Sequence, residues 1–508
     1  MERKALLGQI SFGSQVAEDE RRELARYFVE TDQWKRIFGG EVDIVRGEKG
    51  SGKSAIYSLL TERDAELFDN RVLISSGENP RGDTVFRNIT PDPPNSEAEF
   101  IVLWKLYVLC IVAKVMRNYD LRDNSARLVY SALEEDGLID PDTTLAALLN
   151  RVQRTVKRLM RQVKFDGTAT VDVNTGTPVV SGKISIGEPT DDARKKGARS
   201  LDELFSLLDS SLKEADFRAW VLLDRLDVAF IDNHTLEENA LRALMRVYSD
   251  IRNYDSISLK IFIREDIWKR ITYAGFREAS HITRFVVLGW DRLSLLNLLM
   301  RRALSNDLIV GEFGINTEEV LKDASAQEAL FGRLFPAQVE QGERKSSTFD
   351  WMINRCADGT KKTAPRELVH LLNCLREQEA RRLERGGTLP PDDQLFYRSV
   401  FKQALPTVSE TRLYQYLYAE YPAYRRYIEM LDRQKTEQTP ASLAGLWGSN
   451  VGGAIKTARE LVALGFFEER GTREEPTFWV PFLYRDALRM VQGKAGETGK
   501  AEGEEEEE

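Results

Sequence analysis

The sequence predicts a three-layer α/β core, followed by a helical lid and a C-terminal winged-helix domain, from three observations. A glycine-rich loop at 47–54 joins a short strand pattern at 41–46 to the start of a helix. Two later apolar runs, 219–223 and 258–263, each lead into a charged residue, as buried parallel strands do at the edge of a sheet. Beyond residue 290 the strands stop, helices follow, and a helix–helix–hairpin pattern comes last.

The glycine-rich loop reads GEKGSGKS and fits the phosphate-binding pattern G-x-x-x-x-G-K-[ST] at every fixed position. Its glycines let consecutive N–H groups face an anion, and the next helix adds its positive dipole end. Lys53 would reach the β- and γ-phosphates of ATP, and the Ser54 hydroxyl would hold Mg²⁺. The alternative is a glycine-rich turn that matches by chance. The predicted nucleotide-binding residues are Gly47, Glu48, Lys49, Gly50, Ser51, Gly52, Lys53, Ser54 and Ala55.

Composition excludes several other classes of protein. The 508 residues suffice for two to four domains, and the apolar fraction of 42% is ordinary for a soluble protein. Three cysteines without a close pair and three histidines predict a reducing compartment, no disulfide framework and no zinc site. No signal peptide opens the chain, and Lys105 and Lys114 interrupt its most apolar stretch, 100–116. That stretch predicts a buried helix, no membrane span and a cytoplasmic protein.

The segments on either side of the loop predict more helix and a second core strand. Residues 1–40 have a helical pattern, and Tyr27 or Phe28 would either stack on adenine or pack in the core. Residues 71–75 read as a buried strand. Ser96 follows a loop and predicts the cap of the apolar helix.

An insertion at 150–199 is basic, with eleven Lys/Arg against five Asp/Glu in a chain of net charge −9. A β-hairpin is predicted at 168–186. The insertion is either a solvated surface or a site for nucleic acid or an acidic partner. The basic residues that share one face of its predicted helix are Arg151, Arg154, Lys157, Arg158 and Arg161.

A second nucleotide motif ends the strand pattern at 219–223, after a helix at 201–215 that Ser200 would cap. Asp224 emerges where this strand ends and would orient Mg²⁺. Asp227 would polarise the attacking water, or else cap a turn.

Two arginines next to later strands are candidates for phosphate contacts. Arg264 ends the next strand, where it would sense the γ-phosphate or pair with Glu265 or Asp266. Arg284 precedes a strand at 285–288 and could act as an arginine finger on the nucleotide of a neighbouring copy.

The predicted lid, residues 291–390, holds a helix that begins in the motif TAPREL. Thr363 would cap this helix, and Pro365 fits its first turn because a missing N–H costs nothing there. Arg366 would point from the helix N-terminus towards the phosphates, or else lie on the surface.

The last folded segment, 391–490, has the element order of a winged helix. Six Lys/Arg balance six Asp/Glu between residues 440 and 492, and the presumed recognition helix offers only Lys456 and Arg459. A protein contact is therefore at least as good a reading as DNA binding. The predicted elements are helices at 443–447 and 454–464, a hairpin at 466–470 and 477–482, and a closing helix at 483–491.

Taken together, the motifs GEKGSGKS, WVLLDRLD, IFIRED and TAPREL resemble the STAND-like and AAA+-like branch of P-loop ATPases. The resemblance covers roughly residues 10–490, and the opening FGSQVAEDE is similar to an uncharacterised bacterial family of that branch. The D-x-L-D form from Asp224 to Asp227 is similar to NACHT- and KAP-type members, in which the second acid serves catalysis. AAA+ members usually carry glutamate where this chain has Arg225, so the resemblance favours the STAND-like assignment.

The resemblance implies roles for two arginines and a class of function. Arg264 matches the sensor position and Arg366 the second, lid-borne sensor. Proteins of this type are often molecular switches, and many bacterial ones act in antiphage defence.

The leading hypothesis is an ATP-binding, slowly hydrolysing switch that acts through self-assembly or a partner effector protein, since the sequence has no nuclease, protease or deaminase pattern. The absence of an N-K-x-D motif favours ATP over GTP. The alternatives are a nucleic-acid-acting ATPase of initiator or loader type and a non-catalytic, nucleotide-held scaffold. The expected domains are 1–40, 41–290, 291–390, 391–490 and an acidic, disordered tail at 491–508 that aids solubility or binds a partner.

Overall fold

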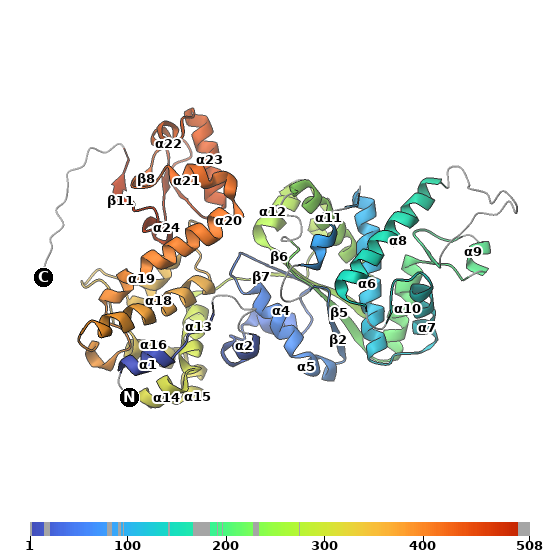
Figure 1. The fold of residues 1–508 in the computed structure, drawn as a ribbon, viewed down its shortest axis with the longest axis horizontal. Helices are drawn as coiled ribbons and strands as arrows, with labels where there is room; N and C mark the ends of the chain where they lie inside the picture. Colours follow the sequence, from blue (N-terminus) through green and yellow to red (C-terminus); the bar gives the residue numbers. More distant parts are fainter. Residues whose placement is uncertain are drawn as a thin grey trace. The chain divides into compact units, whose positions relative to one another are not determined.

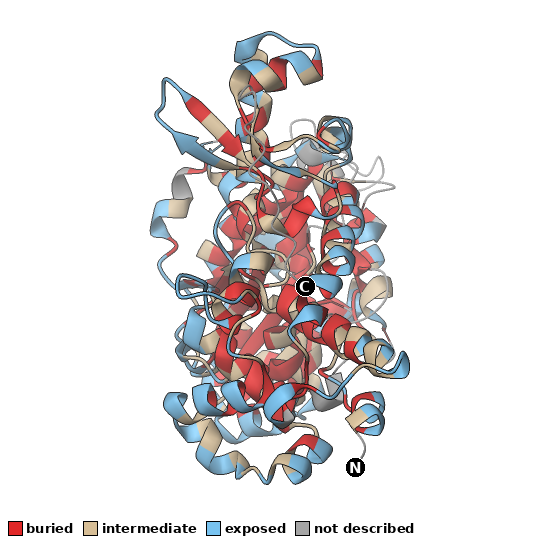
Figure 2. Cartoon of the chain, turned by 90° about the vertical axis from the view of Figure 1, so that its left-hand side faces the viewer, coloured by how far each residue is buried: buried red, intermediate tan, exposed pale blue. Residues whose placement is uncertain are grey.

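The protein forms two compact units, and each is described on its own: residues 30–289 make one, and residues 1–29 with 290–508 make the other. Each unit has its own cluster of buried apolar side chains. Figure 2 shows these buried residues on the inner faces of the packed elements. The computed structural model describes residues 3–14, 21–78, 84–89, 93–94, 96–140, 143–165, 183–189, 191–195, 197–226, 233–273 and 275–495.

A five-stranded parallel sheet runs through the unit of residues 30–289, in the strand order β2-β5-β6-β1-β7 (Figure 1). Because all five strands are parallel, their carboxyl ends meet at one edge. The predicted α/β fold class is confirmed, and each predicted core strand lies within three residues of its observed bounds. The strands are β1 (Ile44–Gly47), β2 (Val72–Ser76), β5 (Arg218–Leu223), β6 (Ile257–Arg264) and β7 (Phe285–Val287).

Helices cover both faces of this sheet, with α4 and α5 on one side and α6 and α11 on the other (Figure 1). The predicted apolar helix is α6, which lies inside the unit and whose Trp104 Nε1 donates to Ala240 O at 2.8 Å. Searching the described part of the chain finds no helix that meets the length and apolarity a bilayer crossing requires. The helices are α3 (Asp32–Phe38), α4 (Lys53–Glu62), α5 (Asp64–Asp69), α6 (Glu97–Asn118), α7 (Asn124–Glu135), α10 (Leu201–Glu214), α11 (His234–Ile251) and α12 (Glu265–Tyr273), with a 3-10 turn η2 (Val85–Ile89).

Two predicted caps are confirmed in this unit. Ser96 Oγ accepts a hydrogen bond from Glu99 N at 3.3 Å at the start of α6. Ser200 Oγ accepts one from Glu203 N at 3.2 Å at the start of α10. Each hydroxyl satisfies a main-chain N–H that has no partner within its helix.

The basic insertion contains the predicted helix as α8 (Leu145–Phe165), followed by α9 (Asp191–Lys195). Most of the predicted hairpin, residues 168–182, lies outside the described residues. The described end of its return strand, β3 (Ile184–Ser185), pairs in parallel with β4 (Arg199–Ser200). Asp136 anchors this segment, since its carboxylate accepts from the main-chain N atoms of residues 183 and 184 at 3.2 Å each.

The second unit begins with α1 (Arg3–Gln9), which packs against α18 (Pro365–Glu384). Pro365 lies in the first turn of α18 as predicted, but the predicted cap is wrong. Residue 364 takes the cap position, and Thr363 Oγ1 instead donates to Ile353 O at 2.9 Å. The other helices of this unit before the C-terminal segment are α2 (Arg21–Tyr27), α13 (Arg292–Leu304), α14 (Asp307–Phe313), α15 (Thr317–Lys322), α16 (Ala324–Leu334), α17 (Thr348–Cys356), α19 (Ser399–Glu410), the π-helix η6 (Thr411–Leu417), α20 (Tyr418–Glu420) and α21 (Arg425–Glu429).

The C-terminal segment contains two helices, α22 (Pro440–Trp447) and α23 (Val451–Ala463), and the predicted hairpin. Two further strands, which the sequence analysis missed, complete a four-stranded sheet in the order β11-β8-β10-β9. The predicted closing helix at 483–491 is wrong: helix α24 is four residues long, and strand β11 starts at Val491. The shorter elements are β8 (Lys435–Gln438), β9 (Glu468–Gly471), β10 (Pro476–Trp479), α24 (Phe482–Arg485) and β11 (Val491–Lys494).

Candidate nucleotide-binding site

The loop 47–54 joins the end of β1 to the start of α4 at the carboxyl edge of the sheet. Gly50 and Gly52 have φ values of +83° and +101°, a region that residues with a side chain rarely adopt. Gly47 is required for a different reason, because a Cβ on it would lie 2.4 Å from Ser51 Oγ. The loop therefore curls tightly only because glycine occupies these three positions.

Lys53 lies in the first turn of α4 and folds back over the loop. Its Nζ donates to Gly47 O at 2.9 Å and to Glu48 O at 2.8 Å. The ammonium group is thus held inside the curl of the loop, beside the N-terminus of α4. This places a fixed positive charge where an anion would meet the helix N-terminus.

Ser54 connects the loop to the neighbouring part of the sheet edge. Its Oγ donates to Asp224 Oδ2 at 3.3 Å. Asp224 directly follows β5 and is only 6% exposed. A hydroxyl and a carboxylate side by side are the hard oxygen donors that Mg²⁺ prefers, so these two residues fit a Mg²⁺ site. The prediction that these two residues come together is confirmed, although their role as Mg²⁺ ligands stays a prediction.

Of the other two residues predicted at this edge, the structure describes Arg264 but not Asp227. Register pairs Gly47 with Arg264, so Arg264 begins beside the loop. Its guanidinium, however, binds Asp266 Oδ1 and Oδ2 at 3.0 and 2.8 Å, the ion pair that the sequence offered as the alternative to γ-phosphate sensing. The other candidate partner, Glu265, pairs with Arg46 at 2.7 Å. Asp227 lies outside the described residues, so its role stays a prediction.

No family model matches the chain, and no curated protein matches it. Solved structures that are similar to it include the following three. The ORC1 protein of Aeropyrum pernix in complex with DNA is 11% identical, with 96% of both chains covered and a TM-score of 0.34. The ORC2 protein of the same organism, in ADPNP–ADP complexes, is 12% identical, with 95% of both chains covered and a TM-score of 0.36. A Walker-type ATPase of Pyrococcus abyssi is 12% identical, covering 91% of this chain and 96% of its own, with a TM-score of 0.37.

With TM-scores this low, the assignment of the fold depends on the strand order, the parallel pairing and the loop between β1 and α4. Residues 30–289 form a P-loop core. The sheet order, the loop and the acid at the end of β5 all agree with this assignment.

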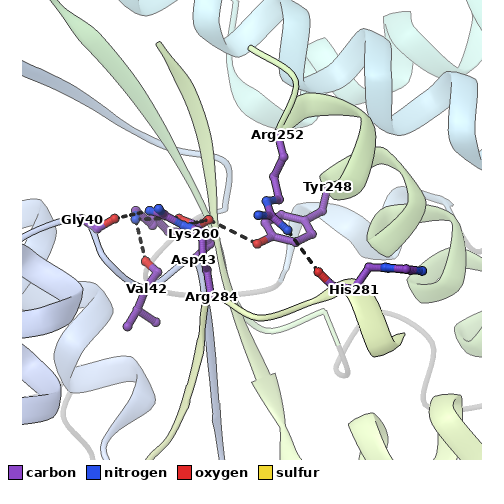
Figure 3. Close-up of polar contacts among 8 residues, drawn as sticks. All are labelled: Gly40, Val42, Asp43, Tyr248, Arg252, Lys260, His281 and Arg284. Carbon is purple, nitrogen blue, oxygen red and sulfur yellow. Dashed lines mark hydrogen bonds and ion pairs between the residues drawn. The ribbon is translucent and has the colours of Figure 1, made fainter. Parts of the chain in front are cut away.

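Arg284 lies at the opposite edge of the P-loop core, before β7, where its exposed side chain joins a polar network around the buried Asp43 (Figure 3). Its Nε donates to Asp43 Oδ2 at 2.7 Å, and its Nη2 donates to Gly40 O. Lys260 Nζ donates to Asp43 Oδ1 at 2.9 Å and Tyr248 OH donates to Asp43 Oδ2 at 3.2 Å. One carboxylate therefore binds two cations and a phenol, just before β1 and β7 begin and beside the middle of β6.

Electrostatics mark this polar network as structural. Lys260 is 0% exposed, and its burial lowers its pKa, while Asp43 opposes that shift. Burial also raises the pKa of Tyr248 above its ordinary value, and the charge of Asp43 raises it further. Beside them, Arg252 Nη1 donates to His281 O at 3.1 Å (Figure 3). The network joins three strands within one chain, and the proposed finger role of Arg284 stays a prediction.

In the other unit, Arg366 lies in the first turn of α18, and its guanidinium lies over the ring of Tyr416, 4.9 Å from the centroid. Tyr27 is buried in the same unit, with the guanidinium of Arg302 4.4 Å from its ring centroid. Tyr27 therefore packs in a core, which was the alternative to stacking on adenine. The sensor role of Arg366 stays a prediction.

Ion pairs occupy part of the basic face of α8. Arg151 pairs with Asp140 at 2.7 Å, and Arg158 with Asp136 at 3.3 Å. Arg154 is exposed and its Nε donates to the main-chain oxygen of residue 150 at 3.3 Å. The helix and its basic face are confirmed, although the side chain of Arg161 lies outside the description. The intramolecular pairs leave less net charge on this face than the sequence suggests.

A similar pairing occurs on the predicted recognition helix α23. Arg459 Nη2 lies 2.9 Å from Glu469 Oε1 on strand β9 of the wing. An arginine neutralised in this way contributes less to binding a phosphate backbone. Lys456 is the other basic side chain of this helix.

Sequence reasoning missed Glu78, which lies two residues after β2. Glu78 is 1% exposed, and its two carboxylate oxygens accept hydrogen bonds from Thr84 and Val85. The available signal was its place after the predicted strand at 71–75. Only the observed order β2-β5 shows that this strand end lies next to Asp224.

Proposed function

We propose that this chain binds ATP with Mg²⁺ on the loop 47–54 and hydrolyses it slowly, as a molecular switch. The observation that supports this most directly is the joined set of Lys53 in the curled loop and Ser54 against Asp224. These groups, from the start of α4 and the end of β5, supply a cation for phosphates and oxygens for a metal.

The loop, Lys53, and the pair of Ser54 and Asp224 each have a separate part in the proposed site. The main-chain N–H groups of the loop and the N-terminus of α4 would bind the phosphate oxygens, as helix N-termini bind anions. Lys53 would exchange its carbonyl partners for the β- and γ-phosphates. Ser54 and Asp224 would hold Mg²⁺, which neutralises charge on the phosphates when it is bound.

The switch part of the proposal depends on Arg264, which would exchange Asp266 for the γ-phosphate. Loss of the γ-phosphate on hydrolysis would then return the Arg264 guanidinium to the partner it has here. The second-sensor role of Arg366 stays a prediction. STAND-like membership and a role in signalling or antiphage defence stay predictions, as does action through self-assembly or a partner protein.

The first test is binding of a fluorescent ATP analogue with Mg²⁺ by Lys53→Ala. Loss of charge-assisted hydrogen bonds costs about 1.5–3 kcal/mol each, so we expect affinity to fall at least about tenfold. The matched control is Lys269→Ala, which removes an exposed lysine of the same unit and should leave affinity unchanged. Equal affinity of wild type and Lys53→Ala would overturn the site assignment.

A second test separates turnover from simple binding. Asp224→Ala should lower the steady-state release of phosphate by at least about 100-fold, because it removes a carboxylate proposed to hold the metal. If wild-type turnover is no higher than that of Asp224→Ala, the chain is a scaffold that holds nucleotide without hydrolysing it.

The alternative of a nucleic-acid-acting ATPase makes a different prediction. It requires salt-dependent binding of DNA that is lost when Arg154, Arg158 and Arg161 are changed to Glu. Because intramolecular acids already pair with Arg158 and Arg459, we expect no binding of a 30-base-pair duplex at physiological salt. Binding that disappears in the triple variant would favour the alternative.

A further inference from the structure

Glu78 lies beside Asp224 at the edge of the sheet that carries the proposed ATP site. The parallel pairing of β2 with β5 places Ser76 opposite Leu222, and Gly77 N continues the ladder by donating to Leu222 O at 2.8 Å. Continued by two residues, this register brings Glu78 opposite Asp224. Neighbouring strands are about 4.8 Å apart, so two acidic residues lie side by side at this edge.

Close packing fixes the main chain at this point. A Cβ on Gly77 would lie 2.6 Å from Leu223 Cδ2 and 3.1 Å from Leu222 O, so glycine lets β2 approach β5 closely. Tyr107 OH also donates to Gly77 O at 2.8 Å from α6. Glu78 therefore follows a rigid strand end.

One phenol links Glu78 to the loop. Tyr57 lies on α4, three residues after Ser54, and its OH donates to Glu78 O at 3.0 Å. Burial raises the pKa of Tyr57 above its ordinary value, a hydrogen bond with Ser76 opposes the shift, and the charges of Asp224 and Glu78 add to it. Both carboxylates are therefore within electrostatic range of the same hydroxyl.

The residue that follows Asp224 in the chain is Arg225, a cation and not an acid. Arg225 has a φ of +56°, a strained value for a residue with a side chain. A carboxylate that could activate water next to Asp224 must therefore come from another position. Among the described residues of this sheet edge, Glu78 is the carboxylate that the register of β2 and β5, continued by two residues, brings opposite Asp224.

We propose that Glu78 is the general base for ATP hydrolysis, and that Thr84 and Val85 hold its carboxylate in a resting position. Thr84 Oγ1 donates to Glu78 Oε2 at 2.6 Å, and Val85 N donates to Glu78 Oε1 at 3.2 Å. This inference rests on the proposed function. It assigns the activation of water to Glu78 in place of Asp227.

Water attacks the γ-phosphorus, a new P–O bond forms, and the bond from the γ-phosphorus to the β–γ bridging oxygen breaks. The electron pair of that bond leaves with ADP. Glu78 takes one proton from the water and then gives it to the inorganic phosphate, which restores the carboxylate.

The test compares Glu78→Gln with wild type in the full-length chain. The amide keeps the size of the carboxyl group and one accepting oxygen, which can still face Val85 N, while its NH2 group donates and cannot act as the base. We expect affinity for the Mg²⁺ complex of a fluorescent ATP analogue to stay within about threefold, and kcat to fall about 10²–10⁴-fold with KM little changed. A kcat within threefold of wild type would overturn the inference.

Thr84→Val is the matched variant, because it removes a hydrogen bond to the same carboxylate and keeps the side-chain volume. We expect its kcat to exceed that of wild type, since the base is released from its resting position. If Thr84→Val loses as much activity as Glu78→Gln, the cluster is structural and the inference is wrong. Asp227→Asn should retain turnover; loss of turnover in Asp227→Asn alone would return the role to Asp227.

Two further measurements separate the role of Glu78 from misfolding of the variant and from failure of the proposed function. If Glu78→Gln does not fold, Glu78→Asp decides: a kcat lowered more than tenfold at unchanged KM supports the inference, and a wild-type kcat overturns it. If the wild-type chain binds no Mg-ATP, the proposed function itself fails. If it binds and hydrolyses ATP while Glu78→Gln does so equally well, only the role of Glu78 fails.

Discussion

At the residue scale, Asp43 carries the largest expected effect on stability. It is 4% exposed and binds Lys260, Arg284 and Tyr248, which leaves the two cations facing each other without it. Removing one member of a buried ion pair typically costs about 3–5 kcal/mol. We therefore expect Asp43→Asn to lower the free energy of unfolding by about that amount, measured by urea denaturation monitored with fluorescence.

A double variant and a surface control make this prediction specific. Adding Lys260→Met removes one cation that Asp43→Asn leaves without its carboxylate. The double variant should therefore recover part of the lost free energy of unfolding. Glu41→Gln breaks only an exposed contact with Arg36 and should cost about 0.5 kcal/mol or less. An Asp43→Asn variant as stable as Glu41→Gln would show that the network contributes little.

The residues of the loop were predictable because their chemistry is local. The positions of Lys53 and Ser54 follow from one motif of eight residues, and the pairing of Ser54 with Asp224 follows from a motif that ends a strand. Glu78 could not be found in this way. Its proximity to Asp224 depends on which strand pairs with β5, and that order is set by packing of the whole sheet.

At the scale of elements, the last strand, β11 (Val491–Lys494), makes a testable contribution. It pairs in parallel with β8, and residue 495 N donates to Glu437 O at 2.8 Å. Truncation after residue 490 should lower the melting temperature of the second unit by several degrees, because it leaves β8 without one neighbour. Truncation after residue 495 removes only the acidic tail and should leave the melting temperature unchanged, as measured by calorimetry.

The same strand illustrates why some elements could not be predicted. The sequence VQGK has neither a clear alternation nor several β-branched residues, so the predicted helix ended at Val491 and the residues after it were assigned to the disordered tail, which is wrong for residues 491–494. Its conformation is decided by the parallel ladder with β8, whose residues lie more than 50 positions earlier. By contrast, the buried strands β5 and β6 are long apolar runs and were predicted almost to the residue.

At the scale of the whole molecule, the second unit is built from both ends of the chain. Leu6 and Leu7 of α1 are buried in the same apolar cluster as residues from α18. Arg376 Nη1 donates to Ile10 O at 2.8 Å, and Asn373 Nδ2 donates to Gly13 O at 2.8 Å. The P-loop core, in contrast, is one continuous stretch of sequence.

This arrangement predicts that the fragment 290–508 is incomplete on its own. Without residues 1–14, the apolar surface that covers Leu6 and Leu7 is exposed, and burying each leucine is worth about 1.5–3 kcal/mol. We expect the fragment to melt at a lower temperature than this unit does in the full chain, and a peptide of residues 1–14 to restore part of the difference in a dose-dependent way. The same peptide with Leu6→Ala and Leu7→Ala is the matched control and should restore less. Equal melting of the fragment with and without the wild-type peptide would mean that α1 adds no stability to this unit.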